Sequence, residues 1–490
     1  MTVLDFYGTA MNSLPFDPAN AKAALAQLPQ TPAVFALYGA EAHAEPYIGR
    51  TPNLRGRLER LLQPSAKHPR RLQLAGRVRE IRLRLTGSDF ESLLVQFELL
   101  EKVHGPKCLE RMHLRLPAFI RFMGGNAYPR ITVTYHPSQR EARWSYGPFQ
   151  SRASAERFAE EALKLFLLRR CTENLDPNPA HPGCVYSEMK MCLAPCYQGC
   201  TDELYAEEAA AVERFLATRG ESRLAGLRTE RDAASANLEF EAAAALHAQM
   251  ARVESVRALA PELVRPLSQL RAVILQASAN PGEVAVFLYE NGRLSGPAAF
   301  STLGMRIQNE QSGSTSLFAQ PMAIEAVLET TEIRDQRSEI TSAATEPTVA
   351  PQWIVSSKGT GFSPYINPAI STGASAPEAA SSGNALASSA DSGAAPAEAP
   401  SGAPAKAARG LLDARMEAAL AELVTRSKAP SPTLRQGYLA LLKRWYYRPE
   451  ARRAGEIFFP DAEGRWPVKA MLRGVGRVAA GSLRHREPQG

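Results

Sequence analysis

The order of apolar and polar residues predicts several strands and helices in the first part of the chain. Residues 32–38 (PAVFALY) have the composition of a buried strand, and residues 46–49 (PYIG) have that of a partner strand after a polar turn. A helix is expected to begin at Asn53, because asparagine is a preferred N-cap residue. Apolar and charged residues alternate from 80 to 85, and a helix with apolar residues at helical spacing follows from about Ser88. This order of elements predicts a small α+β domain.

Further strands and helices are expected along the rest of the chain. Residues 117–149 are strand-like and lead into a helix, ASAERFAEEALKLF. Residues 201–259 are rich in Ala, Glu and Arg, which favours two or three helices. The runs AVILQAS and EVAVFLYE predict strands within residues 262–345. Near the end of the chain, KRWYYRP and EIFFPDAEGRWPVKAML predict a helix followed by a hairpin.

The composition changes sharply from about residue 341 to residue 408, where Ala, Ser, Gly and Pro predominate. Such a segment cannot bury enough apolar surface to offset the entropy of ordering it, so we predict a disordered linker. The expected fold class is a multidomain α+β protein. Its expected divisions are an N-terminal extension (1–30), a small α/β domain with a short mixed or antiparallel sheet (31–115), a cysteine-rich region (116–200), a helical region (201–260), a mixed α/β region (261–345), the linker (346–408) and a C-terminal domain of unassigned role (409–490).

The net charge of the chain is mildly positive, with 57 Lys and Arg against 50 Asp and Glu. The cations are concentrated between Arg50 and Arg84, and Arg57 falls within the expected apolar face of its helix. Such a group of cations suits a surface that binds phosphates, and it equally suits a solvated helix face. No apolar run reaches the ~18 residues of a membrane span, and the N-terminus lacks a basic start before an apolar core. We therefore expect a cytoplasmic protein with no membrane interaction and with reduced cysteines.

Most of the cysteines fall in one short region of the chain. Four of them are spaced C-x12-C-x7-C-x3-C, namely Cys171, Cys184, Cys192 and Cys196. Four soft thiolates in a cytoplasmic chain predict a metal ion or a cluster rather than disulfides. Structural zinc sites usually have paired C-x2-C ends, which are absent here, although zinc and iron both remain open. Cys200 is an additional thiol outside this set.

Three groups of motifs together resemble a known family. AVFALY, then PYIGR, then Arg57 on the following helix resemble the GIY-YIG nuclease domain. CLAPC at 192–196 and ANLEFEAAAALHAQM at 236–250 resemble the cysteine region and the UVR motif of the UvrC family, the incision component of the excinuclease in bacterial nucleotide excision repair. The resemblance extends over the N-terminal half of that family, and the three modules in this order are far more specific than any one of them.

The resemblance implies an enzyme that makes a metal-dependent single-strand incision beside a lesion in double-stranded DNA. It would act in concert with UvrB and use Mg²⁺ or Mn²⁺. Carried over by position, Tyr47 assists proton transfer to the attacking water, and Arg57 steadies the charge that develops on the phosphate. The residues expected to contact DNA nearby are Gly49, Asn53, Arg55 and Arg60. For the four cysteines the resemblance implies a four-iron, four-sulfur cluster, with zinc as the alternative.

The candidate nuclease site departs from the family pattern at four positions. The first-strand tyrosine of the family is Phe35 here, and a tyrosine of the arginine helix is Leu61. The lysine after YIG is Arg50, which keeps the charge and changes its geometry. The glutamate that holds the divalent metal is Gln96, and a neutral amide supplies no charge to hold a hard dication.

Neighbouring carboxylates are not expected to replace the missing glutamate. Glu98 and Glu101 follow Gln96 by two and five positions, so they lie on other faces of the helix, and Glu91 is no better placed. The fold and the phosphate-binding surface are expected to persist while the chemistry is weakened. The alternative function is therefore a catalytically impaired accessory protein of DNA repair that binds DNA and UvrB.

A narrow apolar stripe runs along the helical segment around residues 236–259. Its members include Leu246, Met250 and Val253, with Phe240 beside them. Such a stripe needs a partner helix, in cis or in trans. The resemblance to the UVR motif implies that these four residues bind UvrB.

Two motifs near the end of the chain bear on nucleic-acid binding. RGVGRVAAGSL at 473–483 has the glycine spacing of one helix-hairpin-helix unit, whose turn places backbone amides on a phosphate. KRWYYR at 443–448 mixes cations with aromatic residues, which suits single-strand binding by stacking. For the second motif we favour a surface helix with buried rings.

Overall fold

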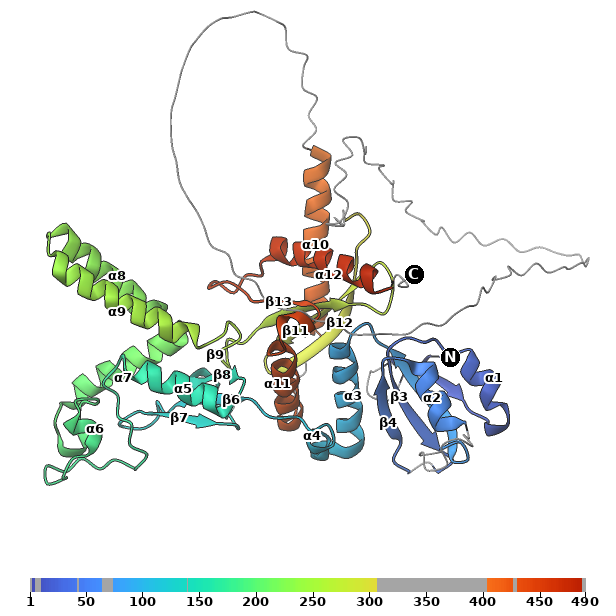
Figure 1. Cartoon of the computed structure of the whole chain (residues 1–490), viewed down its shortest axis with the longest axis horizontal. Coiled ribbons are helices and arrows are strands. Elements are labelled where there is room, and N and C mark those ends of the chain that lie inside the picture. Colours follow the sequence, from blue (N-terminus) through green and yellow to red (C-terminus); the bar gives the residue numbers. More distant parts are fainter. Residues whose placement is uncertain are drawn as a thin grey trace, which may run out of the picture. The chain divides into compact units, whose positions relative to one another are not determined.

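The computed structural model describes seven segments of the chain: residues 2–4, 10–41, 44–63, 74–138, 140–305, 403–425 and 430–486. These residues form an α+β protein whose strands assemble into antiparallel sheets (Figure 1). Single 3₁₀ turns lie at Pro18–Asn20, Gly105–Lys107, Ala142–Trp144, Pro195–Tyr197 and Glu450–Arg452. In the described part of the chain, no helix combines the length and apolar character needed to span a bilayer.

The first sheet has the strand order β1-β2-β5-β3-β4. Its strands are β1 (Thr2–Leu4), β2 (Ala10–Pro15), β3 (Ala33–Gly39), β4 (Tyr47–Thr51) and β5 (Val78–Leu85). Two helices, α1 (Ala21–Ala26) and α2 (Leu54–Leu62), cover the face that carries Phe35. The region named an N-terminal extension from sequence therefore supplies strands to this sheet, because β2 pairs with β5.

The helix α3 (Asp89–His104) covers the opposite face of the first sheet. It begins at Ser88, whose hydroxyl accepts a hydrogen bond from the Glu91 amide at 3.1 Å. Val95 and Leu99 pack against the first sheet, whereas the apolar residues on the other side of α3 join a second core. Because α3 is apolar on two sides, it belongs to both cores.

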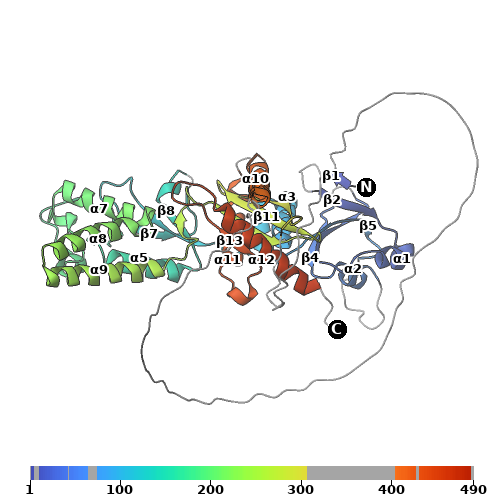
Figure 2. The same cartoon turned by 90° about the horizontal axis from the view of Figure 1, so that it is seen from above.

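A second sheet has the order β7-β6-β8-β9 and carries a group of helices. Its strands are β6 (Ala118–Phe122), β7 (Ile131–Thr134), β8 (Ser145–Phe149) and β9 (Arg265–Pro266). The helices of this part are α5 (Arg152–Leu163), α6 (Val185–Glu188), α7 (Asp202–Ala217), α8 (Glu221–Ala236) and α9 (Phe240–Ala258), whereas the short helix α4 (Cys108–Arg111) packs beside α3. The helices α8 and α9 lie side by side as a helical hairpin (Figure 2).

The third sheet, of order β12-β11-β10-β13, joins segments far apart in the sequence. Its strands are β10 (Ala272–Ala277), β11 (Glu283–Glu290), β12 (Arg293–Ser301) and β13 (Glu456–Phe458). One face packs against α10 (Ala403–Thr425) and α12 (Val468–Arg486), and the other packs against α11 (Pro432–Tyr446) together with α3. The core of this sheet is therefore completed by the last part of the chain.

The C-terminal part corrects three expectations. The predicted hairpin is wrong, because β13 pairs with β10 and is followed by α12. The helix-hairpin-helix prediction for 473–483 is also wrong, since these residues continue α12 without a turn. The predicted linker lies outside the described residues except at its end, where α10 begins at Ala403 rather than after residue 408. Residues 306–345 of the predicted mixed α/β region likewise lie outside the described residues.

Candidate functional site

A tyrosine and an arginine meet where β4 faces α2. Arg57 Nη2 donates a hydrogen bond to the Tyr47 hydroxyl at 3.2 Å, and both side chains are half-buried. The Asn53 side chain caps α2 by accepting from the Gly56 amide at 2.9 Å, which fixes the start of the helix and hence the position of Arg57. The sequence predicted Tyr47 on a strand and Arg57 on the helix that follows, and the structure brings their side chains into contact.

Phe35 and Gly49 form a packing pair beside this site. Phe35 is fully buried, and its ring centroid lies 6.2 Å from that of Tyr47. A Cβ at Gly49 would lie 2.7 Å from Phe35 Cζ, so only glycine fits there without displacing the ring. Phe35 thus fills the core where the family pattern has a hydroxyl, and Gly49 permits its close approach to β4.

Arg50 belongs to an ion-pair group that the sequence did not indicate. It pairs with Asp89 at the start of α3, and Asp89 also accepts from Arg448 Nη2 at 2.7 Å. Burial raises the pKa of Asp89, but the guanidinium groups of Arg448 and Arg50 outweigh it, so the pKa lies below its ordinary value. The only sequence signal for Asp89 is an acidic residue in the first turn of a helix.

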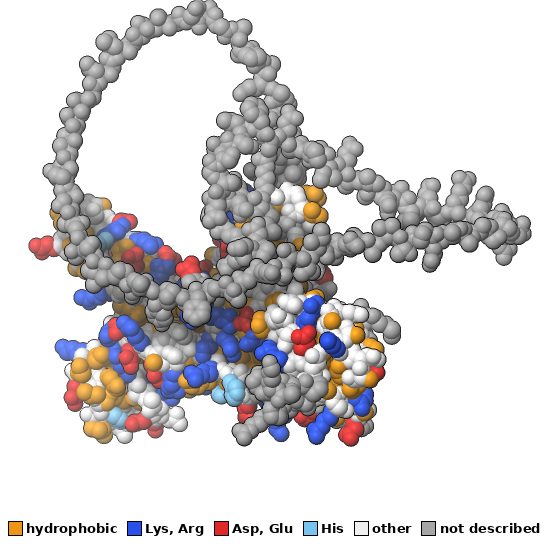
Figure 3. Space-filling model, turned by 45° about the vertical axis from the view of Figure 1, so that its right-hand side comes forward, with side chains coloured by type: hydrophobic (Ala, Val, Ile, Leu, Met, Phe, Trp, Pro, Cys, Tyr) orange, Lys and Arg blue, Asp and Glu red, His pale blue; other side chains and the backbone are white. Residues whose placement is uncertain are grey.

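The two other predicted DNA-binding arginines donate to backbone carbonyl groups. Arg55 Nε donates to Leu28 O at 2.6 Å, which connects α2 to the end of α1. Arg60 Nε donates to Gly56 O at 2.9 Å within α2, and its side chain is exposed. Lysine and arginine side chains occur in several groups over the visible surface (Figure 3). Of the two residues, Arg60 is the better placed to meet a phosphate.

Gln96, which the resemblance aligns with a metal ligand, lies half-buried on α3, and the carboxylates near it in the sequence have other partners. Glu98 Oε1 accepts from the Tyr438 hydroxyl at 3.0 Å, and Glu101 Oε1 accepts from the Ser431 hydroxyl at 3.4 Å. Burial raises the pKa of Glu98 against the opposing effect of Tyr438 and nearby cations. Both carboxylates are therefore directed towards α11.

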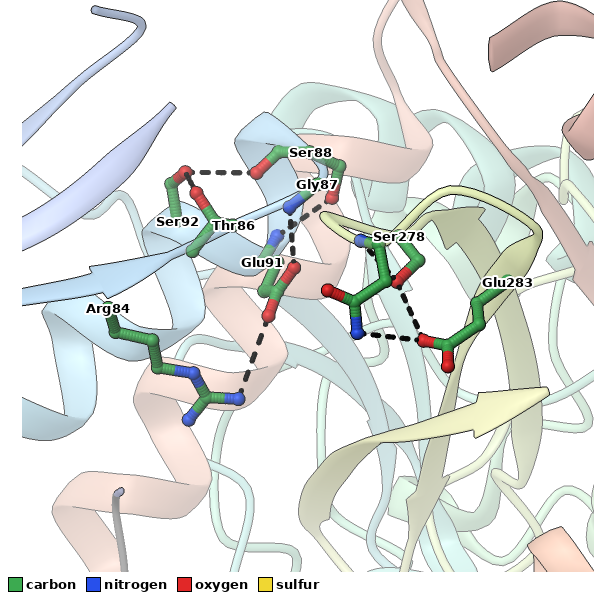
Figure 4. A network of polar contacts seen from close by, with 9 residues as sticks. Arg84, Thr86, Gly87, Ser88, Glu91, Ser92, Ser278 and Glu283 are labelled. Carbon is green, nitrogen blue, oxygen red and sulfur yellow. Dashed lines mark hydrogen bonds and ion pairs between the residues drawn. The ribbon is translucent and has the colours of Figure 1, made fainter. Parts of the chain in front are cut away.

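Glu91 is directed back towards the start of its own helix (Figure 4). Its Oε2 accepts from the Gly87 amide at 2.8 Å, and its Oε1 lies 3.6 Å from Arg84 Nη2. Burial raises the pKa of Glu91 above its ordinary value, and the Gly87 amide and Arg84 lower it by a smaller amount. With a neutral amide at Gln96 and the neighbouring carboxylates engaged, the residues of α3 do not fit a hard dication.

The four predicted cluster ligands line one pocket beside α6. Its lining consists of Cys171, Cys184, Cys192, Cys196, Arg169, Arg170, Leu175, Tyr186 and Pro195. Burial raises the pKa of the Cys192 and Cys196 thiols. Cys200 is not part of this lining.

The donor chemistry of this pocket suits an iron–sulfur cluster, because four thiolates are the ligands that such a cluster takes. As the side chains lie, the described residues include no three His, Cys, Asp or Glu groups that could hold one metal ion between them. The cluster therefore stays a prediction, supported by the shared pocket.

The helical hairpin of α8 and α9 exposes large apolar side chains at its turn. Met250 and Val253 are 7% and 1% exposed and pack in the core of this chain, with Leu246 partly buried beside them. Phe240 is 66% exposed and Leu238 is 70% exposed at the turn. Two of the four residues predicted to bind UvrB, Met250 and Val253, are therefore buried within this chain. The surface left for such a partner is the turn between α8 and α9, where Phe240 is exposed.

Comparison with known proteins gives one family model and several similar relatives. Residues 118–215 match the family model described as the UvrC/Cho excinuclease, middle domain. The UvrABC system protein C of Alcanivorax borkumensis is 30% identical over 243 residues, which cover 49% of this chain and 39% of that protein. The protein of the same name from Carboxydothermus hydrogenoformans is 26% identical over 314 residues, which cover 63% of this chain and 51% of that protein.

These matches cover about half or less of the relatives' own length. A third relative, the UvrABC system protein C of Desulforudis audaxviator, is 30% identical over 282 residues and is covered to 44%. No solved structure gives a significant match. The residues that match the family model extend from β6 to α7 and include the four cysteines of the pocket. The relatives are all named UvrABC system protein C. Over its N-terminal half, this chain is similar to the UvrC family, and residues 118–215 match the model of that family's middle domain.

Proposed function

We propose that the chain acts in nucleotide excision repair, placing its Tyr47–Arg57 pair on a phosphate of a damaged duplex and making a single-strand incision there. The observation that carries this proposal is the 3.2 Å hydrogen bond between Arg57 Nη2 and the Tyr47 hydroxyl. A cation beside a hydroxyl is an arrangement that can bind a phosphate oxygen and pass a proton near it. Similarity to relatives named UvrABC system protein C supports the setting of this activity.

Arg57 has donors left for a phosphate. A guanidinium carries five N–H donors in a planar fork, and Arg57 uses one of them on Tyr47. The geometry of the remaining donors suits two oxygens of one phosphate, which gives orientation as well as charge. Arg60 is exposed on the same helix and would add to the affinity for the backbone.

The partners that we propose are a lesion-bearing duplex and UvrB. The exposed apolar residues Leu238 and Phe240 at the tip of the hairpin would meet a helical partner. The cysteine pocket would hold a four-iron, four-sulfur cluster, or a zinc ion in its place. Both are proposals that rest on the family resemblance together with the burial and positions of these side chains.

A second candidate function is an accessory protein that binds DNA and UvrB without cutting. The observation that favours it is that the carboxylates near Gln96 in the sequence have other partners: Glu91 accepts from the Gly87 amide, and Glu98 accepts from the Tyr438 hydroxyl. A phosphate-binding surface can persist without the charge that holds a catalytic dication.

An incision assay separates the two candidates. A lesion-bearing duplex loaded with UvrB would be incubated with native protein, Arg57→Ala, Gln96→Glu and Arg60→Ala, in Mg²⁺ and in Mn²⁺. Arg60→Ala removes a cation from the same helix without touching Tyr47, so it separates weaker duplex binding from loss of cutting.

Incision by native protein that is lost in Arg57→Ala, with Arg60→Ala still cutting, supports the enzyme. No cutting by native protein, with cutting restored in Gln96→Glu, supports the accessory function. Native protein that neither cuts nor retains the UvrB-loaded duplex in a gel-shift assay would overturn both candidates.

A further inference from the structure

Arg169 carries a buried positive charge next to the cysteine pocket. The residue is 4% exposed. Its Nε donates to Tyr128 O at 3.0 Å, and its Nη1 donates to Glu173 O at 2.9 Å and to Cys171 Sγ at 3.4 Å. These acceptors are neutral carbonyl groups and one thiol. Across the described residues, no Asp or Glu forms an ion pair with this guanidinium.

A buried guanidinium without an anion is unfavourable, because hydrogen bonds to neutral groups compensate only part of the lost hydration. The pocket that Arg169 lines also contains four thiols. When such thiols act as ligands they do so as thiolates, and together they bring negative charge to the pocket. Arg169 therefore lies where a counter-charge to ligated cysteines would be needed.

We propose that Arg169 is a positioning residue for the group held by the four cysteines: it orients Cys171 and offsets the charge of the ligands. This inference rests on the cluster of the proposed function. A fixed cation and an N–H donor to a ligand sulfur both favour the more negative, reduced form of an iron–sulfur cluster, so they raise its reduction potential. Removing Arg169 is then expected to shift the potential to a more negative value and to weaken retention of the cluster.

Arg170 provides a matched control at the next position. It lines the same pocket, but its Nη2 donates to Leu163 O at 2.9 Å and its guanidinium lies over the Tyr186 ring at 5.9 Å. Unlike Arg169, it has no hydrogen bond to a cysteine sulfur among the residues described. Arg170→Gln therefore removes an equal charge nearby without removing a contact to a ligand.

The test compares four full-length proteins purified without oxygen: native protein and the variants Arg169→Gln, Arg169→Lys and Arg170→Gln. Iron, sulfide and zinc per chain are measured first, and then the reduction potential by a titration followed by absorbance. For Arg169→Gln we expect a more negative potential and loss of iron to a chelator about 10-fold faster or more. Arg169→Lys keeps the charge, so its potential should lie between that of Arg169→Gln and that of native protein.

Equal potentials and equal iron loss in native protein and Arg169→Gln would overturn the role of Arg169 and leave the cluster standing. The role of Arg169 would also be overturned if Arg170→Gln shifted the reduction potential as much as Arg169→Gln. Native protein that holds neither iron nor zinc overturns the cluster itself, and the inference with it. If native protein holds zinc, the readout becomes the rate of zinc release, which must rise in Arg169→Gln. If Arg169→Gln does not fold, Arg169→Lys decides, because this variant loses the contact to Cys171 Sγ, so a potential and a rate of iron loss equal to those of native protein contradict the proposal.

Discussion

Gly437 on α11 faces the ring of Phe97 on α3 so closely that a Cβ at position 437 would lie 1.9 Å from Phe97 Cζ. Phe97 is fully buried, so its ring has little room to move away. The absence of a side chain at Gly437 is therefore what lets the two helices approach.

Gly437→Ala is expected to lower the free energy of unfolding by about 1 kcal/mol or more, because overpacking costs more than the gain in helix propensity. Urea unfolding measures this difference. Gly226→Ala is the matched control: Gly226 also lies in a helix, but a Cβ there meets nothing within 4 Å. We expect that control to gain about 0.5–1 kcal/mol. Equal stabilisation of both variants would contradict the close contact.

Asn53 is expected to contribute to stability as a helix cap. Asn53→Ala removes the acceptor for the Gly56 amide and should cost about 0.5–2 kcal/mol in the free energy of unfolding. Asn53→Ser, which can still cap, should retain most of the stability. Thermal unfolding together with a duplex-binding titration checks this. A binding loss in both variants with no change in stability would instead favour the predicted DNA contact.

The hairpin should separate folding from binding. Phe240→Ser changes an exposed side chain, so the free energy of unfolding should stay within about 0.5 kcal/mol while capture by UvrB weakens. Met250→Ala empties part of the core and should cost about 2–5 kcal/mol. Unfolding and UvrB pull-down are measured for both variants. A stability loss in Phe240→Ser as large as that in Met250→Ala would mean that the tip is packed.

Glu91 should make stability depend on pH. Burial raises its folded pKa above the ordinary value of 4.5, against the effect of Gly87 and Arg84. Its contribution to the free energy of unfolding is therefore fully present below pH 4.5 and is lost as the pH rises through the raised value. Glu91→Gln should flatten the stability profile above pH 4.5, measured by urea unfolding at several pH values. A profile unchanged by the substitution would show that another group causes the pH dependence.

The helix starts and the strands of the N-terminal part could be predicted because each depends on residues that are adjacent in the sequence. The caps at Asn53 and Ser88 begin α2 and α3 as predicted, and PAVFALY and PYIG correspond to β3 and β4. Predicting the proximity of Tyr47 and Arg57 needed only this strand–turn–helix order.

Contacts between distant segments could not be predicted in this way. The hairpin predicted for EIFFPDAEGRW is replaced by a turn, in which Asp461 accepts from the Glu463 and Arg465 amides, and the strand before it pairs with β10. The glycine spacing of 473–483 suggested a hairpin turn. Instead, a Cβ at Gly474 would lie 2.6 Å from Phe458 Cζ, so this glycine serves the approach of α12 to β13. Asp89 and Arg169 owe their importance to partners that the local pattern does not reveal.

The completion of the third sheet by α10, α11 and α12 has a consequence for the newly made protein. A ribosome adds about 5–20 residues per second. It finishes β12 at Ser301 many residues before it reaches α10 at Ala403. For those seconds one face of the strands lacks α10 and α12, while the other face has only α3 and still lacks α11. A stalled chain ending at residue 305 should therefore be cut quickly by a protease within β10 to β12, whereas the released full-length protein should resist.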